Sequence, residues 1–307
     1  MLLIVFVFSL ISVESWNPTN FTFNPGPNYE LVWSDEFENV GPVQAIINGK
    51  PAYAPNPANW IHRLGYHLDA GVEKYTDAIE NAYVQDGQLN IVVNESGYIT
   101  PTQIRYTSAM LSTEGLQEFT YGMFAAKIRV PYGKGMWPAF WMHGHDHRYN
   151  LSWPTTGEID ILEMYGGTAG DYTGDLIPHA TIHWNNASAT MNPLVHKYVS
   201  KTWRTPDNSS LHNNSLVYWS EWTPTNISIG INEYTYYQMN TTNMSNSFNP
   251  VVAFSGMFPY CLRLDIAITA APPGPPDNTT VIPQAMIVDW VRVYQQKKNT
   301  NYMNHLI

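Results

Sequence analysis

The sequence predicts an all-β fold, a sandwich of two antiparallel sheets. Short runs that are apolar or alternate in polarity, rich in Val, Ile, Tyr, Phe and Trp, recur between turn residues. Long helical periodicity is absent, because Pro and Gly interrupt nearly every stretch in which a helix could extend. Two packed sheets would bury large apolar faces, and an open concave outer face would offer a groove for a long ligand. The expected strands are 89–93, 124–130, 158–164, 180–184, 216–222, 227–231, 263–267 and 285–294.

The composition excludes several classes of protein. The 307 residues are 44% hydrophobic, 14% aromatic and 13% charged, which argues against a disordered chain or a coiled coil. A nucleic-acid binder would carry a basic balance, whereas 15 Lys and Arg stand against 25 Asp and Glu. No internal repeat is visible, and strand-like sequence resumes directly after the proline-rich loop 271–276. We therefore expect one folded, acidic domain over residues 16–307, without a nucleic-acid partner.

The N-terminus predicts export. Residues 1–11 are apolar but too few to span a bilayer, and the small residues Val13 and Ser15 suit cleavage after Ser15. Residues 1–15 are thus expected to be a signal peptide, with a buried N-terminal strand as the alternative. No second apolar run reaches membrane length, so we expect a soluble monomer outside the cell or in the lumen of the secretory and endolysosomal route.

Glycosylation sequons support the same route, because they outnumber what the composition would supply by chance. They begin at Asn20, Asn94, Asn150, Asn186, Asn208, Asn213, Asn226, Asn240, Asn243 and Asn278.

The lone cysteine is a candidate for thiol chemistry, and a run of histidines is a candidate for metal binding. Cys261 lies in an apolar run and has no second cysteine to pair with, which favours a small buried hydrophobe over a catalytic thiol. The run from His143 to His147 is interpreted as a polar loop, with metal binding as the alternative.

Three carboxylates in the expected strand 158–164 carry the chemistry. Side chains alternate on a strand, so Glu158 and Asp160 share one face while Glu163 would point to the other. A β-bulge around Ile161-Leu162 would restore the phase and bring all three acids to one side. The outer pair would then be roughly 13 Å apart at Cα, and inward-leaning side chains could approach the ~5–5.5 Å carboxyl separation of a retaining glycosidase.

The charge pattern around these acids assigns their roles. No Lys or Arg lies between Arg148 and Lys197, so mutual repulsion should raise at least one carboxyl pKa. We assign Glu158 as nucleophile and Glu163 as acid/base, with Asp160 between them sharing a proton with Glu158. A solvated acidic strand face and a cation site are the alternatives.

The run Gly157-Glu158-Ile159-Asp160-Ile161-Leu162-Glu163 resembles the active-site motif of glycoside hydrolase family 16 in its laminarinase-like, bulged form. The resemblance implies a β-jelly-roll, retaining stereochemistry and endo-hydrolysis of a β-linked polysaccharide, most often β-1,3-glucan, with no cofactor needed for catalysis. Further matching segments, in the order of the family, are 33–37, 75–77, 80–87, 106–109, 121–124, 135–142 and 288–294.

The resemblance also implies binding residues. It places Trp137 and Trp141 at subsites beside the cleaved bond, where indole faces stack on sugar rings; without it, core packing would be the ordinary interpretation. Trp153 is a further candidate of this kind. His183 is a candidate hydrogen-bond partner for a sugar hydroxyl, with a structural role as the alternative.

A structural Ca²⁺ far from the cleft is a further implication of the resemblance. The matching positions are Glu36, Asp289 and the backbone oxygen near Gly87, and oxygen ligands suit this hard cation.

Departures from the family pattern leave the exact substrate open. Residues 69–71, Met110, Met123 and Ala125 replace polar or charged residues that are common in relatives. The alternatives to an endo-β-1,3-glucanase are a non-catalytic β-glucan recognition protein and an enzyme for mixed-linkage β-1,3-1,4-glucan or galactan. Scarce Lys and Arg argue against sulfated galactans, and the sequence does not separate hydrolysis from transglycosylation.

Overall fold

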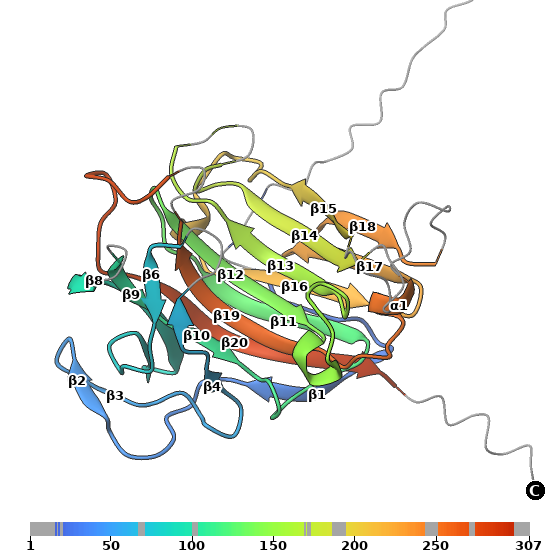
Figure 1. Ribbon diagram of the computed structural model, residues 1–307, viewed down its shortest axis with the longest axis horizontal. Coiled ribbons are helices and arrows are strands. Elements are labelled where there is room, and N and C mark those ends of the chain that lie inside the picture. Colours follow the sequence, from blue (N-terminus) through green and yellow to red (C-terminus); the bar gives the residue numbers. More distant parts are fainter. Residues whose placement is uncertain are drawn as a thin grey trace, which may run out of the picture.

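The structure, a computed structural model, is almost entirely β (Figure 1). It describes residues 16, 18, 21–66, 71–99, 104–168, 170, 173–185, 195–242, 251–269 and 274–297. Within these residues the helical elements are short: α1 (Val251–Phe254) and two 3₁₀ turns, Asp146–Tyr149 and Leu211–Asn213. The all-β prediction is confirmed, and every expected strand lies in or overlaps an observed one.

The larger sheet has 11 strands in the order β18-β17-β16-β11-β20-β8-β9-β6-β5, with β1 paired to β20 and β7 to β8. All of its pairs are antiparallel except β6 with β9, which is parallel. Its strands are β1 (Tyr29–Asp35), β5 (Gly65–Tyr66), β6 (Glu73–Tyr75), β7 (Ala82–Gln85), β8 (Gln88–Ile99), β9 (Ile104–Ser108), β11 (Gly122–Arg129), β16 (Leu216–Trp222), β17 (Asn226–Ile231), β18 (Tyr234–Asn240) and β20 (Gln284–Gln296).

The second sheet has seven antiparallel strands in the order β15-β14-β13-β12-β19-β10-β4. Its strands are β4 (Ile61–His62), β10 (Met110–Ser112), β12 (Met136–His143), β13 (Glu158–Met164), β14 (Pro178–Asn185), β15 (His196–Thr202) and β19 (Cys261–Ile268). A separate hairpin joins β2 (Ala45–Ile47) and β3 (Lys50–Ala52). The two sheets lie one over the other (Figure 1), and the buried core includes side chains from both.

Strand β13 contains the predicted bulge. Asp160 stands opposite Thr181 of β14 and Glu163 opposite His179, so two residues of β13, Ile161 and Leu162, face only one residue of β14. The β12 side shows the same shift between Phe140 and Trp141. Ile161 and Leu162 are both fully buried in the core. Because the bulge uses one extra residue on the core side, the acids before and after it return to the same outer face.

Gly157 lies directly before β13, and its replacement tests how tightly the start of this strand is packed. Its φ is +85°, and an added Cβ would lie 2.2 Å from the Tyr260 hydroxyl oxygen. We expect Gly157→Ala to lose more than the ~1–3 kcal/mol of a strained backbone alone. The measurement is urea unfolding of the Ala variant beside Gly87→Ala, whose φ of +74° is similar but whose Cβ would meet nothing within 4 Å. Equal losses in the two variants would contradict the packing argument.

Candidate active site

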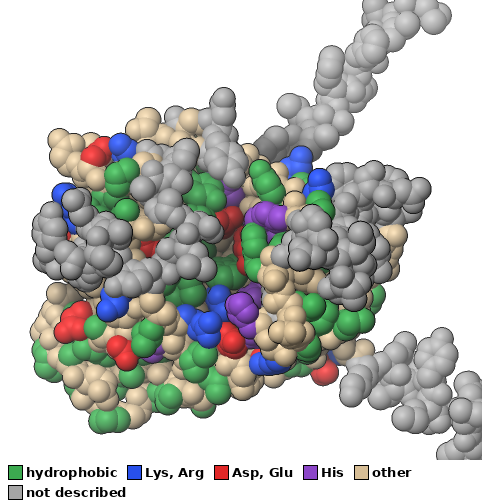
Figure 2. Space-filling model, in the orientation of Figure 1, with side chains coloured by type: hydrophobic (Ala, Val, Ile, Leu, Met, Phe, Trp, Pro, Cys, Tyr) green, Lys and Arg blue, Asp and Glu red, His purple; other side chains and the backbone are tan. Residues whose placement is uncertain are grey.

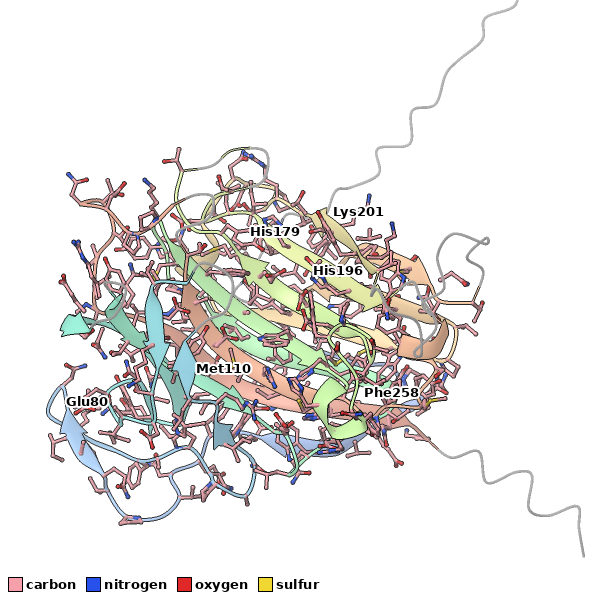
Figure 3. All side chains as sticks on the ribbon, in the orientation of Figure 1. Glu80, Met110, His179, His196, Lys201 and Phe258 are labelled. Atoms are coloured by element: carbon pink, nitrogen blue, oxygen red, sulfur yellow. The ribbon has the colours of Figure 1, made fainter. Side chains whose placement is uncertain are left out.

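The three acids of β13 gather on the outer face of the seven-stranded sheet. Asp160 and Glu163 are buried and Glu158 is half-buried. Figure 2 shows acidic and histidine side chains together in a hollow near the middle of this face. Figure 3 places His179 and His196 on the β14–β15 side of β13 and Met110 across the sheet on β10. The sequence prediction that one strand presents all three carboxylates together is confirmed.

Glu163 is held by three hydrogen-bond donors. The Trp137 indole N–H and the Tyr165 hydroxyl donate to Oε1, at 2.9 and 3.3 Å, and the Thr181 hydroxyl donates to Oε2 at 3.0 Å. The two hydroxyls can also accept a hydrogen bond, so this environment suits both the ionised and the protonated carboxyl.

Glu158 has a different environment. The Trp153 indole N–H donates to its Oε2 at 2.9 Å, and His183 Nε2 lies 3.9 Å from its Oε1. Burial, followed by the negative charge of Asp160, raises the pKa of Glu158 to about 8. The predicted repulsion among uncompensated acids is therefore present.

Asp160 lies between these two acids and contacts His183, which in turn contacts His196. His183 Nε2 is 3.2 Å from Asp160 Oδ2, and His183 Nδ1 is 2.9 Å from His196 Nε2. Burial, then the charges of Glu163 and Asp265, raises the pKa of Asp160 well above its usual value. A neutral His196 that donates to His183 Nδ1 would leave His183 Nε2 as a donor to Asp160. His196 was not found from the sequence, because it comes from a neighbouring strand with no motif.

A fourth acid, Asp265 of β19, was also missed. Its Oδ2 accepts a hydrogen bond from the Tyr75 hydroxyl at 2.8 Å, and its Oδ1 accepts one from the Trp141 indole N–H at 2.7 Å. The Arg263 guanidinium lies 4.7 Å from the centroid of the Trp141 ring. Trp141 therefore lies beside the three acids of β13, but its indole is positioned by the fourth acid, Asp265.

The predicted binding residues all lie at this face. Trp137 and Trp153 use their indole N–H groups to hold Glu163 and Glu158, which the sequence did not predict. Trp153 remains 44% exposed, so part of its ring is free for stacking on a ligand. His183 contacts the acids directly, which makes its predicted role toward a sugar hydroxyl secondary to its contact with Asp160.

The residues expected to hold calcium do not fit that role. Both oxygens of Glu36 accept hydrogen bonds from Arg292, each at 2.8 Å. Asp289 forms an ion pair with Lys127 at 2.9 Å and accepts a hydrogen bond from Gln88, the neighbour of Gly87. Because side-chain donors already occupy both oxygens of each carboxylate, the described residues do not fit a calcium ion, which needs oxygens free to coordinate it.

The interpretation of 143–147 as a polar loop is wrong for its first part. His143 ends β12 and is buried, and His145 is buried as well. The prediction of a buried Cys261 is confirmed.

Comparisons with known proteins identify the family of this chain. Residues 73–261 match the model of "Glycosyl hydrolases family 16". A "Beta-glucanase" of Rhodothermus marinus is 32% identical over 274 residues, covering 88% of this chain and 86% of that protein. The chain therefore belongs to glycosyl hydrolase family 16.

Two further relatives illustrate the range of matches. A "Glucan endo-1,3-beta-glucosidase A1" of Niallia circulans is 29% identical over 87% of this chain, which corresponds to 38% of that longer protein. Among solved structures, the laminarinase catalytic domain of Thermotoga maritima superposes with a TM-score of 0.72 at 26% identity, covering 88% of this chain and 99% of that one. This structure and that of the laminarinase from Rhodothermus marinus confirm the predicted jelly-roll fold. Among the described residues, no helix is long and apolar enough to span a bilayer.

Glu73 of β6 gives a prediction for stability. It is fully buried, and although one oxygen accepts the Ile268 backbone N–H at 3.0 Å, burial raises its pKa to about 7. The folded protein thus binds a proton more tightly than the unfolded chain, so stability falls as pH rises from the unfolded pKa of Glu to about 7. Glu73→Gln should remove this loss and be more stable than the parent by up to about 3 kcal/mol at pH ~8. Denaturant unfolding at pH ~5 and ~8 measures the free energy of unfolding of both proteins. The same gain in Glu80→Gln, which changes an exposed carboxylate, would contradict the role of the buried Glu73.

Trp153→Phe tests the hydrogen bond to Glu158. Loss of the indole N–H removes an interaction that favours the ionised carboxyl, so the pKa of Glu158 should rise further above about 8. Carboxyl NMR titration of the labelled protein measures the shift. Trp219→Phe is the control, because that indole donates to the carbonyl of Asn232 at 2.9 Å on the other sheet. An unchanged Glu158 pKa in Trp153→Phe would contradict the assignment.

Proposed function

We propose that the protein is a secreted, retaining endo-β-1,3-glucanase that hydrolyses β-glucan by double displacement. The observation that carries the proposal is the bulged β13, which presents Glu158 and Glu163 on one face with Asp160 between them. This is the pair of carboxyl groups that a retaining glycosidase needs on the two sides of one glycosidic bond.

In the first step, the Glu158 carboxylate attacks the anomeric carbon while Glu163 donates its proton to the leaving oxygen. The glycosidic bond breaks and a glycosyl-enzyme ester forms on Glu158. In the second step, Glu163 takes a proton from water, the water oxygen bonds to the anomeric carbon, and the ester bond to Glu158 breaks. Configuration at the anomeric carbon is inverted twice and is therefore retained.

Asp160 supports this cycle by holding a proton beside Glu158. The pKa values of Glu158 and Asp160 are both raised, by burial first, so the pair shares a proton at neutral pH. With that proton on Asp160, Glu158 is ionised and nucleophilic, and His183 is placed to accept a hydrogen bond from Asp160 or to donate one to it. The glycosyl-enzyme then forms without leaving two negative charges together.

The substrate assignment draws on the relatives and on the surroundings of the acids. Relatives named as a beta-glucanase and a glucan endo-1,3-beta-glucosidase match most of this chain. Trp137, Trp141 and Trp153 surround the acids and offer aromatic surface for a neutral sugar. Of the departures noted in the sequence, Met123 and Ala125 lie on β11 in the other sheet, whereas Met110 pairs with Asp265. Residues 69 and 70 lie outside the described part of the chain.

Export, glycosylation and a monomeric state are part of the proposal. Residues 1–15, the expected signal peptide, lie outside the described residues, as do the sequons at Asn20, Asn186 and Asn243. Sequon asparagines that are exposed, and therefore accessible to modification, are Asn150, Asn208, Asn213, Asn240 and Asn278.

The second candidate is a non-catalytic β-glucan recognition protein. One similar protein, from Penaeus monodon, is named "Beta-1,3-glucan-binding protein" and is 38% identical over 93 residues. Binding to laminarin with no product after long incubation would favour this candidate. Cleavage of mixed-linkage β-1,3-1,4-glucan or of agar, a galactan, in preference to laminarin would instead favour an enzyme for one of those substrates.

Glu158→Gln and Glu163→Gln test the catalytic roles. Each should lower reducing-sugar release from laminarin by about a thousandfold or more, with the far-ultraviolet circular dichroism unchanged. Glu221→Gln is the matched control, because that carboxylate lies on β16 of the other sheet and hydrogen-bonds Tyr29. Full activity in either active-site variant would contradict the assignment.

The product formed with azide separates the two roles. In Glu158→Ala, azide should attack the substrate directly and give an α-glycosyl azide. In Glu163→Ala it should attack the glycosyl-enzyme on Glu158 and give the β-anomer. The reverse pattern would exchange the roles of nucleophile and acid/base.

A further inference from the structure

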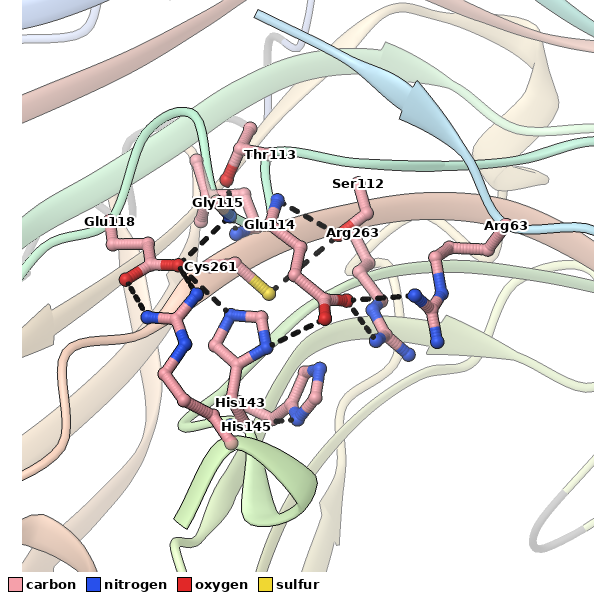
Figure 4. A network of polar contacts seen from close by, with 12 residues as sticks. Arg63, Ser112, Thr113, Glu114, Gly115, Glu118, His143, His145, Cys261 and Arg263 are labelled. Atoms are coloured by element: carbon pink, nitrogen blue, oxygen red, sulfur yellow. Dashed lines mark hydrogen bonds and ion pairs between the residues drawn. The ribbon is translucent and has the colours of Figure 1, made fainter.

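A second cluster of reactive side chains lies beside the acids but takes no part in the proposed hydrolysis. His143, His145 and Cys261 can bring one ligand atom each within 4.8 Å of the others. Their exposed fractions are 9%, 4% and 0%. Figure 4 shows the two imidazoles, the thiol and the Glu114 carboxylate turned toward one another.

The polar atoms of this cluster are not fully used by the protein itself. His143 Nε2 is buried and has no hydrogen-bond partner. His143 Nδ1 accepts the backbone N–H of His145 at 3.3 Å, a long contact that costs little to lose if the ring proton moves from Nε2 to Nδ1. This buried nitrogen has no hydrogen-bond partner and faces a thiol and a second imidazole. Together the three side chains form an incomplete set of metal ligands.

Glu114 lies beside this set. Its Oε1 lies 3.2 Å from His145 Nδ1, but it is not among the side chains that each bring a ligand atom within 4.8 Å of all the others. Its Oε2 lies 3.2 Å from both Arg63 and Arg263.

Partners of the ligands are also present. His145 Nε2 lies 3.4 Å from Glu118 Oε1, and a carboxylate on the second ring nitrogen is the usual partner of a metal-bound histidine. The Ser112 hydroxyl lies 3.7 Å from Cys261 Sγ.

The charge of the cluster permits a divalent cation. Arg63, Arg148 and Arg263 surround Glu114 and Glu118, and His145 between the two carboxylates forms ion pairs with both when protonated. A divalent ion that displaces the His145 imidazolium proton and the Cys261 thiol proton leaves the sum of charges unchanged.

We propose that His143, His145 and Cys261, each through one ligand atom, form a buried structural site for a borderline-soft divalent cation of the Zn²⁺ type. The Glu114 carboxylate, whose Oε1 lies 3.2 Å from His145 Nδ1, would have to turn inward to supply the fourth ligand. The ion would tie together the end of β12 and the start of β19. His143 pairs with Glu158 across β12 and β13, so the site would brace the strand that carries the acids.

Cobalt spectroscopy tests the site directly, because Cys261 is the only cysteine in the chain. Co²⁺ added to the reduced, metal-free protein should give a thiolate-to-cobalt charge-transfer band that saturates at one equivalent and is displaced by Zn²⁺. Cys261→Ala should abolish the band, and His143→Gln should weaken Co²⁺ binding by about tenfold or more. No band in the parent protein, or unchanged binding in His143→Gln, would overturn the proposal.

His183→Gln is the control for metal binding at the active site. Glu158, Asp160 and His183 also form a group that could hold a cation, but they contain no sulfur, so this variant should leave the band unchanged. Zn²⁺ should also raise the thermal unfolding midpoint of the parent and not that of Cys261→Ala, because an ion that binds only the folded state stabilises it. An equal rise in both proteins would place the ion elsewhere and overturn the site.

Discussion

The active-site arrangement depends on the mismatch of one residue between β13 and β14. Ile161 and Leu162 both enter the core opposite the single residue Ala180, and Glu163 thereby returns to the face of Glu158 and Asp160. The apolar core fixes this register, because a slip by one residue would turn the carboxylates from the outer face into the apolar core and turn Ile159 and Leu162 out of it. The free energy of core packing thus maintains a cluster of like charges that would otherwise separate.

Burying the acids has consequences for the residues around them. No Lys or Arg contacts the three carboxylates within the described residues; the groups that do are Trp, Tyr, Thr and His. Neutral donors satisfy the oxygens without cancelling the charge, so burial first and repulsion among the acids second raise the pKa values of Glu158 and Asp160. Lys and Arg side chains instead pair with other carboxylates, among them Glu114, Glu118, Glu36 and Asp289. The acids of the described chain therefore lie in two environments. Those of β13 contact only neutral donors and histidine, whereas others form ion pairs with Lys or Arg.

Sequence reasoning found what depends on local pattern. Alternation within 158–164 gave the strand, the need for a bulge and the three acids, whereas Trp137, Trp141 and Trp153 became candidates through the family resemblance. It missed what depends on pairing between distant segments. Asp265, Tyr75 and His196 reach the site from β19, β6 and β15, and strands of two or three residues such as β4, β5 and β10 have no periodicity to detect. The calcium prediction considered Glu36 and Asp289 without the side chains that the sheets place beside them, which already use their carboxylate oxygens.

The central claim is that the bulge makes Glu158 the nucleophile of a retaining glycosidase. Trapping the covalent intermediate with a 2-deoxy-2-fluoro laminaribiosyl fluoride, followed by proteolysis and mass spectrometry, tests it most directly. Because the fluorine slows breakdown of the glycosyl-enzyme, we expect one sugar per protein, attached to Glu158. A sugar attached to Glu163 or to Asp160, or cleavage of laminarin by a protein that is never labelled, would contradict it.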